Sequence, residues 1–442
     1  MGSGARPVLP ALTLDQLVSR QVRVPDVVQV RRVPHATGPP LDVAAVVREQ
    51  LALPLRVVRP GDTVAVGVGS RGITRIADVV RAVVGEIRAV GGSPYLVPAM
   101  GSHGSVSAAG QTAVLADLGI TDEIAPVRAS MDTLPLGRAS DVDVHLSTEA
   151  AAADHLIVVN RLKSHTSFTG RIESGLAKMV AIGLGKQRGA QELHRLGPLQ
   201  LERRILAAYA LIASEVPLLG GLAVTEGAGK TLLSLDFVPP DGIGADHEAD
   251  LLRRAKDQEA RLPFPRIDVL VVDRMGKELS GTGLDTNVIG RRMVRGSPEP
   301  DGPDVTNVVV LGVTPASEGN AVGLGLADFV PVAALDGVDL ATTYMNALTA
   351  GLQGVQRAQI PIALATERDA VTAALMTAGV PDPADARIVR IRSTLALDDL
   401  MVTPNLLEHL APHEAPGEPH PLFADDRLAP WVAPGPERGS LR

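Results

Sequence analysis

Residues 63–97, TVAVGVGSRGITRIADVVRAVVGEIRAVGGSPYLV, decide the fold class of this chain. Residues 63–68 form a short aliphatic run that is typical of a buried strand, and residues 76–90 place apolar side chains at helical spacing. A Gly-Gly pair then predicts the end of that helix, and residues 95–97 predict the next strand. A strand, a helix and a second strand in this order form the unit from which helix-covered parallel sheets are built.

The same alternation continues along the chain and extends the prediction to the whole protein. Aromatic residues make up only 2% of the sequence, so the core must consist of Val, Leu, Ile and Ala, as in parallel sheets buried on both faces. We expect an α/β fold with two α/β domains, mainly parallel sheets and a cleft between the domains. Further aliphatic runs predict strands at residues 156–159, 222–225, 269–272, 308–313 and 362–365.

Composition shifts along the chain suggest where its domains begin and end. The length of 442 residues suits more than one domain. A charged, Pro-containing stretch near residue 262 predicts an N-terminal domain over residues 1–262 and a second domain over 263–405. Residues 406–442 are rich in Pro, Gly and charge, which predicts a loosely attached tail.

Charge and cysteine content exclude several classes of protein. The formal net charge of −8 disfavours a nucleic-acid partner, because neutralising phosphates requires a basic surface. The chain has no cysteine, which removes disulfides, thiolate metal sites and a cysteine nucleophile. No apolar run reaches membrane-spanning length and the first residues do not read as a secretory signal, so we expect a cytoplasmic protein without a membrane partner.

A glycine-rich turn follows the first predicted strand. Residues 67–72, GVGSRG, match the spacing of a dinucleotide-binding turn between a strand and a helix. No acidic residue closes the next strand to hold a ribose, so an NAD-dependent dehydrogenase is a minor alternative. A turn that offers backbone N–H groups to some other anion is the better interpretation.

The stretch most informative about chemistry runs over residues 159–194, VNRLKSHTSFTGRIESGLAKMVAIGLGKQRGAQELH. It leaves a predicted strand and gathers lysine, arginine, histidine and glutamate side chains between glycines, which allow close approach of backbone to a ligand. Read from the residues alone, the stretch is either an anion-binding site or a basic surface loop before a helix.

Four short blocks in chain order resemble the nickel-dependent lactate racemase family. The resemblance spans roughly residues 20–400 and is strong between 60 and 200. The blocks are a turn at Ile73-Thr74-Arg75, a loop at Gly101-Ser102-His103-Gly104, His165 followed by Ser174-Gly175-Leu176-Ala177-Lys178, and His194, sixteen residues beyond Lys178.

The resemblance implies a cofactor and a set of residues that hold it. The cofactor is a nickel pincer nucleotide covalently tethered to Lys178 through a thioamide, with His194 as the nickel ligand. Catalytic roles fall to His103 and His165, one base for the hydroxyl of each enantiomer. The remaining cofactor-binding positions are Gly72, Thr74, Arg75 and Lys186, where the Arg75 guanidinium suits an anionic cofactor or substrate group.

Departures from the family pattern fall on substrate-contacting positions. Gly72 stands where the family has Asp, and Leu176 replaces a glycine. The second domain lacks the Tyr-Gln-x-x-Lys helix and offers Lys277 and Arg291 as carboxylate clamps, which we include among the catalytic residues. We therefore expect a racemase or epimerase of a 2-hydroxyacid other than lactate.

Two alternatives and two kinds of partner accompany this expectation. The same hydride relay could serve another isomerisation, such as sugar-acid epimerisation, or the chain could bind the nickel nucleotide without turning over a substrate. Two intact histidines favour an enzyme, because a carrier needs no pair of bases. Expected partners are the small 2-hydroxyacid substrate and the enzymes that make the cofactor, while the oligomeric state stays open.

Overall fold

The computed structural model describes residues 6–18, 22–32, 40–69, 73–104, 107–228, 231–411 and 414–432. The chain forms two compact units, and each is described by itself. Unit 2 is continuous, from Ala36 to Ala260, whereas unit 1 combines Met1–His35 with Arg261–Arg442. In the part of the chain that the structure describes, no helix is both long enough and apolar enough to cross a membrane.

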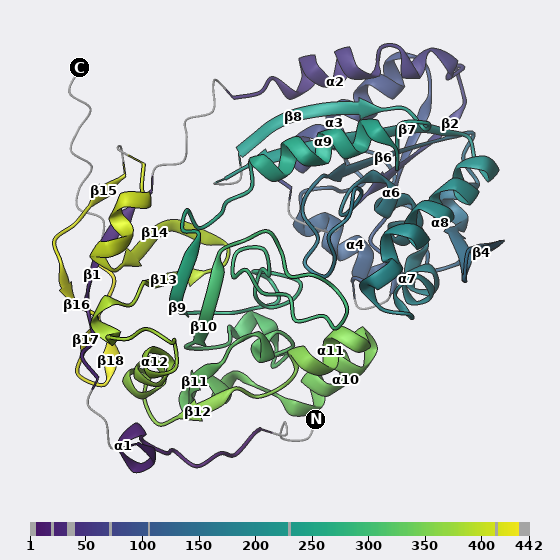
Figure 1. Ribbon diagram of the computed structural model, residues 1–442. Coiled ribbons are helices and arrows are strands. Elements are labelled where there is room, and N and C mark those ends of the chain that lie inside the picture. The colour runs from purple at the N-terminus through teal and green to yellow at the C-terminus, as the bar shows by residue number, and fades with distance from the viewer. Residues whose placement is uncertain are drawn as a thin grey trace, which may run out of the picture. The chain divides into compact units, whose positions relative to one another are not determined.

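Unit 2 is built on a sheet with the strand order β3-β2-β6-β7-β8 (Figure 1). Strands β3 (Ser93–Pro98), β2 (Thr63–Val68), β6 (His155–Arg161) and β7 (Leu218–Gly227) are parallel, and β8 (Thr231–Val238) is antiparallel at the edge. A separate hairpin pairs β4 (Thr133–Ala139) with β5 (Val142–Ser147).

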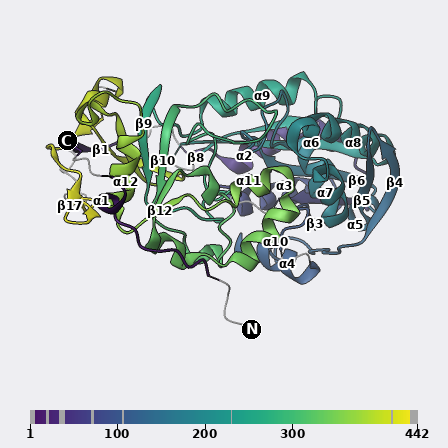
Figure 2. The same cartoon turned by 60° about the horizontal axis from the view of Figure 1, so that its bottom comes forward.

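Helices cover both faces of this sheet because its strands alternate apolar side chains between the faces. Val64, Val66 and Val68 of β2 pack with α2 (Val43–Leu51) and α3 (Ile76–Ala89). On the other face Leu156 and Val158 of β6 pack with the segments that follow β6. Those segments are α6 (Leu176–Lys178), a π-helical turn at Met179–Gly183, α7 (Lys186–His194), α8 (Leu201–Glu215) and α9 (Asp246–Asp257). Figure 2 shows α6, α7 and α8 side by side. The remaining helices of the unit are α4 (Ala108–Asp117) and α5 (Thr148–Ala151).

Unit 1 contains a larger mixed sheet whose main path is β12-β11-β10-β9-β13-β14-β1-β15. Its parallel part consists of β12 (Ile362–Leu364), β11 (Phe329–Pro331), β10 (Asp304–Val310), β9 (Arg266–Val272) and β13 (Ile388–Ser393). Its antiparallel part consists of β14 (Ala396–Val402), β1 (Asp26–Arg31), β15 (Ala415–Pro416) and β16 (His420–Pro421). A hairpin with a two-residue turn pairs β17 (Phe423–Ala424) with β18 (Arg427–Leu428).

The helices of unit 1 are α1 (Leu14–Leu17), α10 (Leu340–Ala350), α11 (Leu352–Arg357) and α12 (Glu367–Met376). The inward side chains of α12, among them Ala370, Val371 and Ala374, pack on Val269 and Val309 of the sheet. Both units therefore confirm the predicted α/β class. The predicted cleft between domains stays a prediction.

The division of the chain differs from the predicted domains in two respects. A break near residue 262 is present, but residues 1–35 belong with the C-terminal unit, because β1 pairs with β14. Described residues of the predicted tail 406–442 also join this sheet, since β15 and β16 both pair with β1. The described residues of the tail, 406–411 and 414–432, therefore form part of unit 1.

Candidate functional site

The carboxyl edge of the unit 2 sheet gathers the predicted residues that lie in unit 2. The connection after β2 runs through α3 to β3 on one side, and the connection after β6 runs through α6 to α8 to β7 on the other. The point where connections diverge in this way is where open α/β sheets bind ligands. The structure does not describe residues 70–72, so the predicted cofactor contact of Gly72 lies outside the described residues.

The loop after β3 carries His103 at the surface. Two glycines of this loop adopt left-handed backbone conformations, Gly101 with φ +59° and Gly104 with φ +75°. The Gly101 N–H donates to the carbonyl of Gly183 over 3.1 Å, which anchors the loop to the π-helical turn. The His103 side chain is exposed, and its backbone N–H donates to Met100 over 3.1 Å.

The loop after β6 carries His165 and is closed at its neck. Lys163 and Ser174 exchange two backbone hydrogen bonds of 3.0 and 3.3 Å. The His165 ring is half-buried, lies 4.5 Å from the Phe168 ring, and accepts the Ser167 N–H at Nδ1 over 3.0 Å. A neutral imidazole that accepts at Nδ1 carries its proton on Nε2. His165 therefore presents a hydrogen-bond donor at Nε2.

Two carboxylates, the buried Glu173 and the half-buried Glu259, hold this loop in place. Glu173 accepts the N–H of His165 over 2.6 Å and that of Gly170 over 3.0 Å, and it is paired with Lys256 of α9. Glu259 accepts the Ser164 N–H over 2.6 Å. One glutamate of the loop itself and one distant in sequence therefore fix the backbone on which His165 stands.

Lys178 stands at the end of a short helix whose start is capped by another buried carboxylate. Glu248 accepts the N–H groups of Leu176 over 2.6 Å and Ala177 over 3.2 Å. Burial raises the pKa of Glu248, although these backbone donors oppose that shift. A Cβ on Gly175 would lie 2.2 Å from Glu248 Oε1, so the cap requires glycine there. Lys178 is half-buried and leads directly into the π-helical turn, a feature frequent at functional sites.

His194 ends α7 in the protonation state that a metal ligand needs. Its Nδ1 lies 2.7 Å from the Ala190 carbonyl oxygen, so Nδ1–H donates and Nε2 keeps its lone pair. Burial lowers the pKa of His194, the charge of Lys178 lowers it further, and the Ala190 hydrogen bond opposes both effects. His194 is therefore neutral near pH 7, and Lys178 lies within electrostatic reach of it.

The other cofactor positions predicted in unit 2 are engaged by the protein. Arg75 is paired with Asp78 over 3.0 Å and donates to the Leu41 carbonyl over 2.9 Å. The Thr74 N–H donates to Glu226 over 2.5 Å. Lys186 is fully buried and donates to the Pro98 carbonyl over 2.7 Å and to Gln111 over 3.0 Å. Arg75 and Lys186 therefore each have hydrogen-bond partners within the protein and need no ligand to satisfy their charge.

The two predicted carboxylate clamps belong to unit 1 and have partners there. Lys277 Nζ donates to the carbonyls of Gly281 over 2.8 Å and Val322 over 3.2 Å. The Arg291 guanidinium pairs with Asp328 over 2.6 Å and donates to three backbone carbonyls, those of Val305, Thr306 and Leu326. These contacts give Arg291 a structural role within unit 1. Binding of a substrate carboxylate stays a prediction for both residues.

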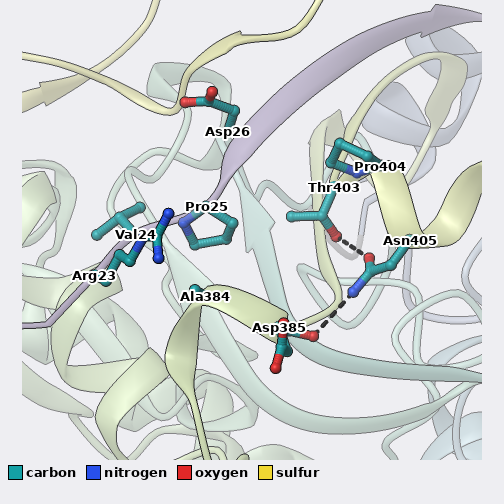
Figure 3. A pocket seen from close by; sticks show the side chains of 9 residues that line it. All are labelled: Arg23, Val24, Pro25, Asp26, Ala384, Asp385, Thr403, Pro404 and Asn405. Carbon is teal, nitrogen blue, oxygen red and sulfur yellow. Dashed lines mark hydrogen bonds between the residues drawn. The ribbon is translucent and has the colours of Figure 1, made fainter.

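A cavity of about 460 Å³ in unit 1 contains none of the predicted site residues (Figure 3). Two of the side chains lining it, Thr403 and Asn405, are hydrogen-bonded to each other over 2.7 Å, and Asn405 also donates to the Asp385 carbonyl over 2.9 Å. Neither histidine nor lysine lines this cavity. Its lining residues are Arg23, Val24, Pro25, Asp26, Ala384, Asp385, Thr403, Pro404 and Asn405.

Comparisons with known proteins add a family without an assigned activity. Residues 67–235, which run from β2 into β8, match the family described as a domain of unknown function, DUF362. A crystal structure of a protein from Thermotoga maritima, a structural genomics target, has 13% identity and a TM-score of 0.48, covering 73% of this chain and 83% of that chain. No curated protein matches the sequence. These comparisons name no reaction, so the resemblance to lactate racemases stays a prediction.

Proposed function

We propose that the protein is a racemase or epimerase of a 2-hydroxyacid that uses a nickel pincer nucleotide tethered to Lys178. One observation carries the proposal: the half-buried Lys178 lies within electrostatic reach of His194, whose Nε2 keeps its lone pair. An amine for a covalent tether and a neutral imidazole for nickel are the two groups that such a cofactor requires from a protein.

The donor set fits this cofactor better than it fits a bare metal ion. Among the described residues, no group of three or more His, Asp or Glu side chains could hold a metal. A site with a single imidazole suits a metal that arrives with its other ligands already bound. When bound, such a nucleotide, held by Lys178 and His194, would supply a reversible hydride acceptor for the substrate Cα.

The chain's own part in the reaction is to move the hydroxyl proton. Strand order places β2 between β3 and β6, so the His103 and His165 loops emerge on opposite sides of the carboxyl end of β2. A substrate held over the end of β2 has one histidine on each side. His103 would take the hydroxyl proton and, as an imidazolium, return it to the same oxygen, while His165, with its proton on Nε2, would donate a hydrogen bond to that oxygen from the other side.

The substrate class follows from the departures in unit 1. Lys277 and Arg291 stand where the lactate racemase pattern has its substrate helix, so we propose a hydroxyacid larger or more acidic than lactate. Turnover of lactate, malate and aromatic 2-hydroxyacids by the loaded enzyme tests this directly. A clear preference for lactate would reject the substrate class while leaving the reaction type in place.

The cofactor is tested by intact mass and nickel analysis of protein co-expressed with cofactor-making enzymes. We expect wild type to carry a nucleotide-sized mass and nickel, and Lys178→Ala to lose both. His194→Gln should keep the mass and lose most of the nickel, because it removes only the metal ligand. His247→Gln, at an exposed position of α9, is the matched control and should behave as wild type.

Two results would contradict the assignment. Wild type without added mass or nickel, beside a loaded lactate racemase control, would remove the cofactor. Added mass that survives in Lys178→Ala would place the tether elsewhere.

A further inference from the structure

The fully buried Lys186 lies beneath the His103 loop. It is the first residue of α7 and adopts φ +54°, an unusual conformation for a residue with a side chain. Its ammonium donates to the carbonyl of Pro98, the last residue of β3, and to Gln111 Oε1 of α4. A buried cation held by neutral oxygens is costly, so its presence calls for a purpose beyond packing.

Gln111 connects this ammonium to the loop. Its side chain is fully buried, and Nε2 donates to the carbonyls of Gly101 over 3.0 Å and His103 over 3.3 Å. An ammonium has only donors, so Gln111 must turn its oxygen toward Lys186 and its nitrogen toward the loop. Lys186 therefore sets the direction of the amide that holds the backbone of His103.

We infer that Lys186 and Gln111 are positioning residues that hold His103 in place for proton transfer. The catalytic part of this inference rests on the proposed function, since it takes His103 as the base. Burial lowers the pKa of Lys186 to about 8, the nearby charge of Glu149 opposes that shift, and the amine is still mostly protonated at pH 7. The cofactor contact predicted for Lys186 is replaced by this structural one, because the side chain has no exposed surface.

Close packing around the loop makes the effect local. A Cβ on Gly104 would lie 2.7 Å from the Gln111 backbone nitrogen, so α4 and the loop are in direct contact. Gln111 is the side chain that reaches from α4 to two of the loop carbonyls. Loss of the Gln111 amide should loosen residues 99–104 and leave the remainder of the sheet edge unchanged.

Hydrogen–deuterium exchange of the full chain tests the positioning without cofactor or substrate. Gln111→Glu keeps an acceptor for Lys186 but presents a carboxylate to the two loop carbonyls, and Lys186→Met removes the ammonium at similar length. We expect exchange in peptides covering residues 99–104 to rise roughly tenfold in both variants. Gln191→Glu, at an exposed position of α7, is the matched control and should leave this exchange unchanged.

Kinetics of the loaded enzyme test whether the positioning serves His103. We expect kcat to fall by about 10- to 100-fold with little change in KM, because a displaced base affects the chemical step. In a His103→Ala background, Gln111→Glu should cause no further loss, since the effect acts through the missing side chain.

Each outcome decides one part of the inference. Unchanged exchange in Gln111→Glu overturns the positioning, and losses that multiply in the double variant overturn its link to His103. If wild type itself shows no racemisation, the exchange result still decides the positioning, while the proposed function fails separately.

Discussion

At the scale of single residues, the hydrogen-bond partner of each polar side chain at the sheet edge determines which group that side chain presents. His165 accepts at Nδ1 and His194 donates at Nδ1, so two half-buried histidines of one segment present opposite groups at Nε2. The sequence predicted both histidines as site residues, but it did not predict which of them carries a proton on Nε2. The partners are backbone groups two and four residues away, Ser167 and Ala190, whose placement depends on the local backbone path.

Residues that support the site were the least visible in the sequence. Glu248 lies seventy residues beyond Lys178, and Gln111 is a lone amide in a helix of small side chains. Neither belongs to a motif, because what each one contacts is decided by strand order and not by spacing. A glycine that a carboxylate requires, such as Gly175, is the only local trace of such a contact.

Lys186 gives a residue-scale prediction for pH. Its pKa is lowered from 10.5 to about 8 in the folded protein, so between these values the unfolded chain binds a proton that the folded chain does not. Stability therefore rises with pH across this window, by up to about 1.4 kcal/mol per pH unit. Below pH 8 both states are protonated and the cost of burying the charge is present in full.

Urea unfolding at a series of pH values measures this effect as the difference between wild type and Lys186→Met. Other titrating groups cancel in that difference. We expect the free energy of unfolding of wild type to rise relative to that of the variant from about pH 8 to about pH 10.5. A flat difference would mean that the amine does not titrate in this range.

At the scale of elements, periodicity predicted the aliphatic strands and the first helix well. The run at residues 63–68 is β2, and the helical spacing at 76–90 is α3, which ends at Ala89. Several strands escaped prediction, including β5, although its residues alternate between apolar and polar side chains, and the two-residue strands β15 and β16. The pairing of β15 and β16 depends on a distant partner, β1, which local patterns do not report.

The capped start of α6 gives an element-scale prediction. Gly175→Ala should lower the free energy of unfolding by at least about 2 kcal/mol, because the new Cβ would lie 2.2 Å from Glu248 Oε1 and 2.7 Å from Leu162. Gly85→Ala is the matched control within α3, where nothing lies within 4 Å of the added Cβ. That variant should gain about 0.5–1 kcal/mol from helix propensity.

Circular dichroism during urea unfolding compares the two variants, and Trp431 fluorescence follows unit 1 separately. Trp431 is the sole tryptophan of the chain and donates to Asp273 over 2.6 Å within unit 1. If the two substitutions changed the free energy of unfolding equally, Glu248 would be able to move away from the added Cβ without loss of stability.

At the scale of the whole molecule, no pattern in the sequence indicated that the N-terminal strand joins the C-terminal unit. Strand β1 pairs with β14, and Gln29 of β1 exchanges hydrogen bonds of 2.8 and 3.2 Å with Val432. Composition shifts mark only boundaries along the chain, so they predicted the break near residue 262 but placed residues 1–35 in the wrong unit. Unit 2 is an insertion within unit 1.

This arrangement predicts different outcomes for different fragments. Residues 36–260 should fold alone, since both faces of their sheet are covered from within. Residues 261–442 should not fold alone, because removing β1 exposes the edge of β14 and frees Val432. Linking residues 22–35 to the end of that fragment should restore folding.

Circular dichroism of the first fragment and Trp431 fluorescence of the others provide the measurements. Trp431 neighbours Val432, so its emission should be red-shifted in 261–442 and return when β1 is added. Native-like emission from 261–442 alone would show that β1 is dispensable.

The insertion also sets an order of events during synthesis. The ribosome delivers β1 first, then all of unit 2, and only afterwards β14, the strand on which β1 must lie. At about 5–20 residues per second, β1 waits some tens of seconds for its partner while unit 2 completes its fold. During that time β1 is a nascent strand with both edges open, and its charged end residues, Asp26 and Arg31, guard it against premature pairing with another polypeptide.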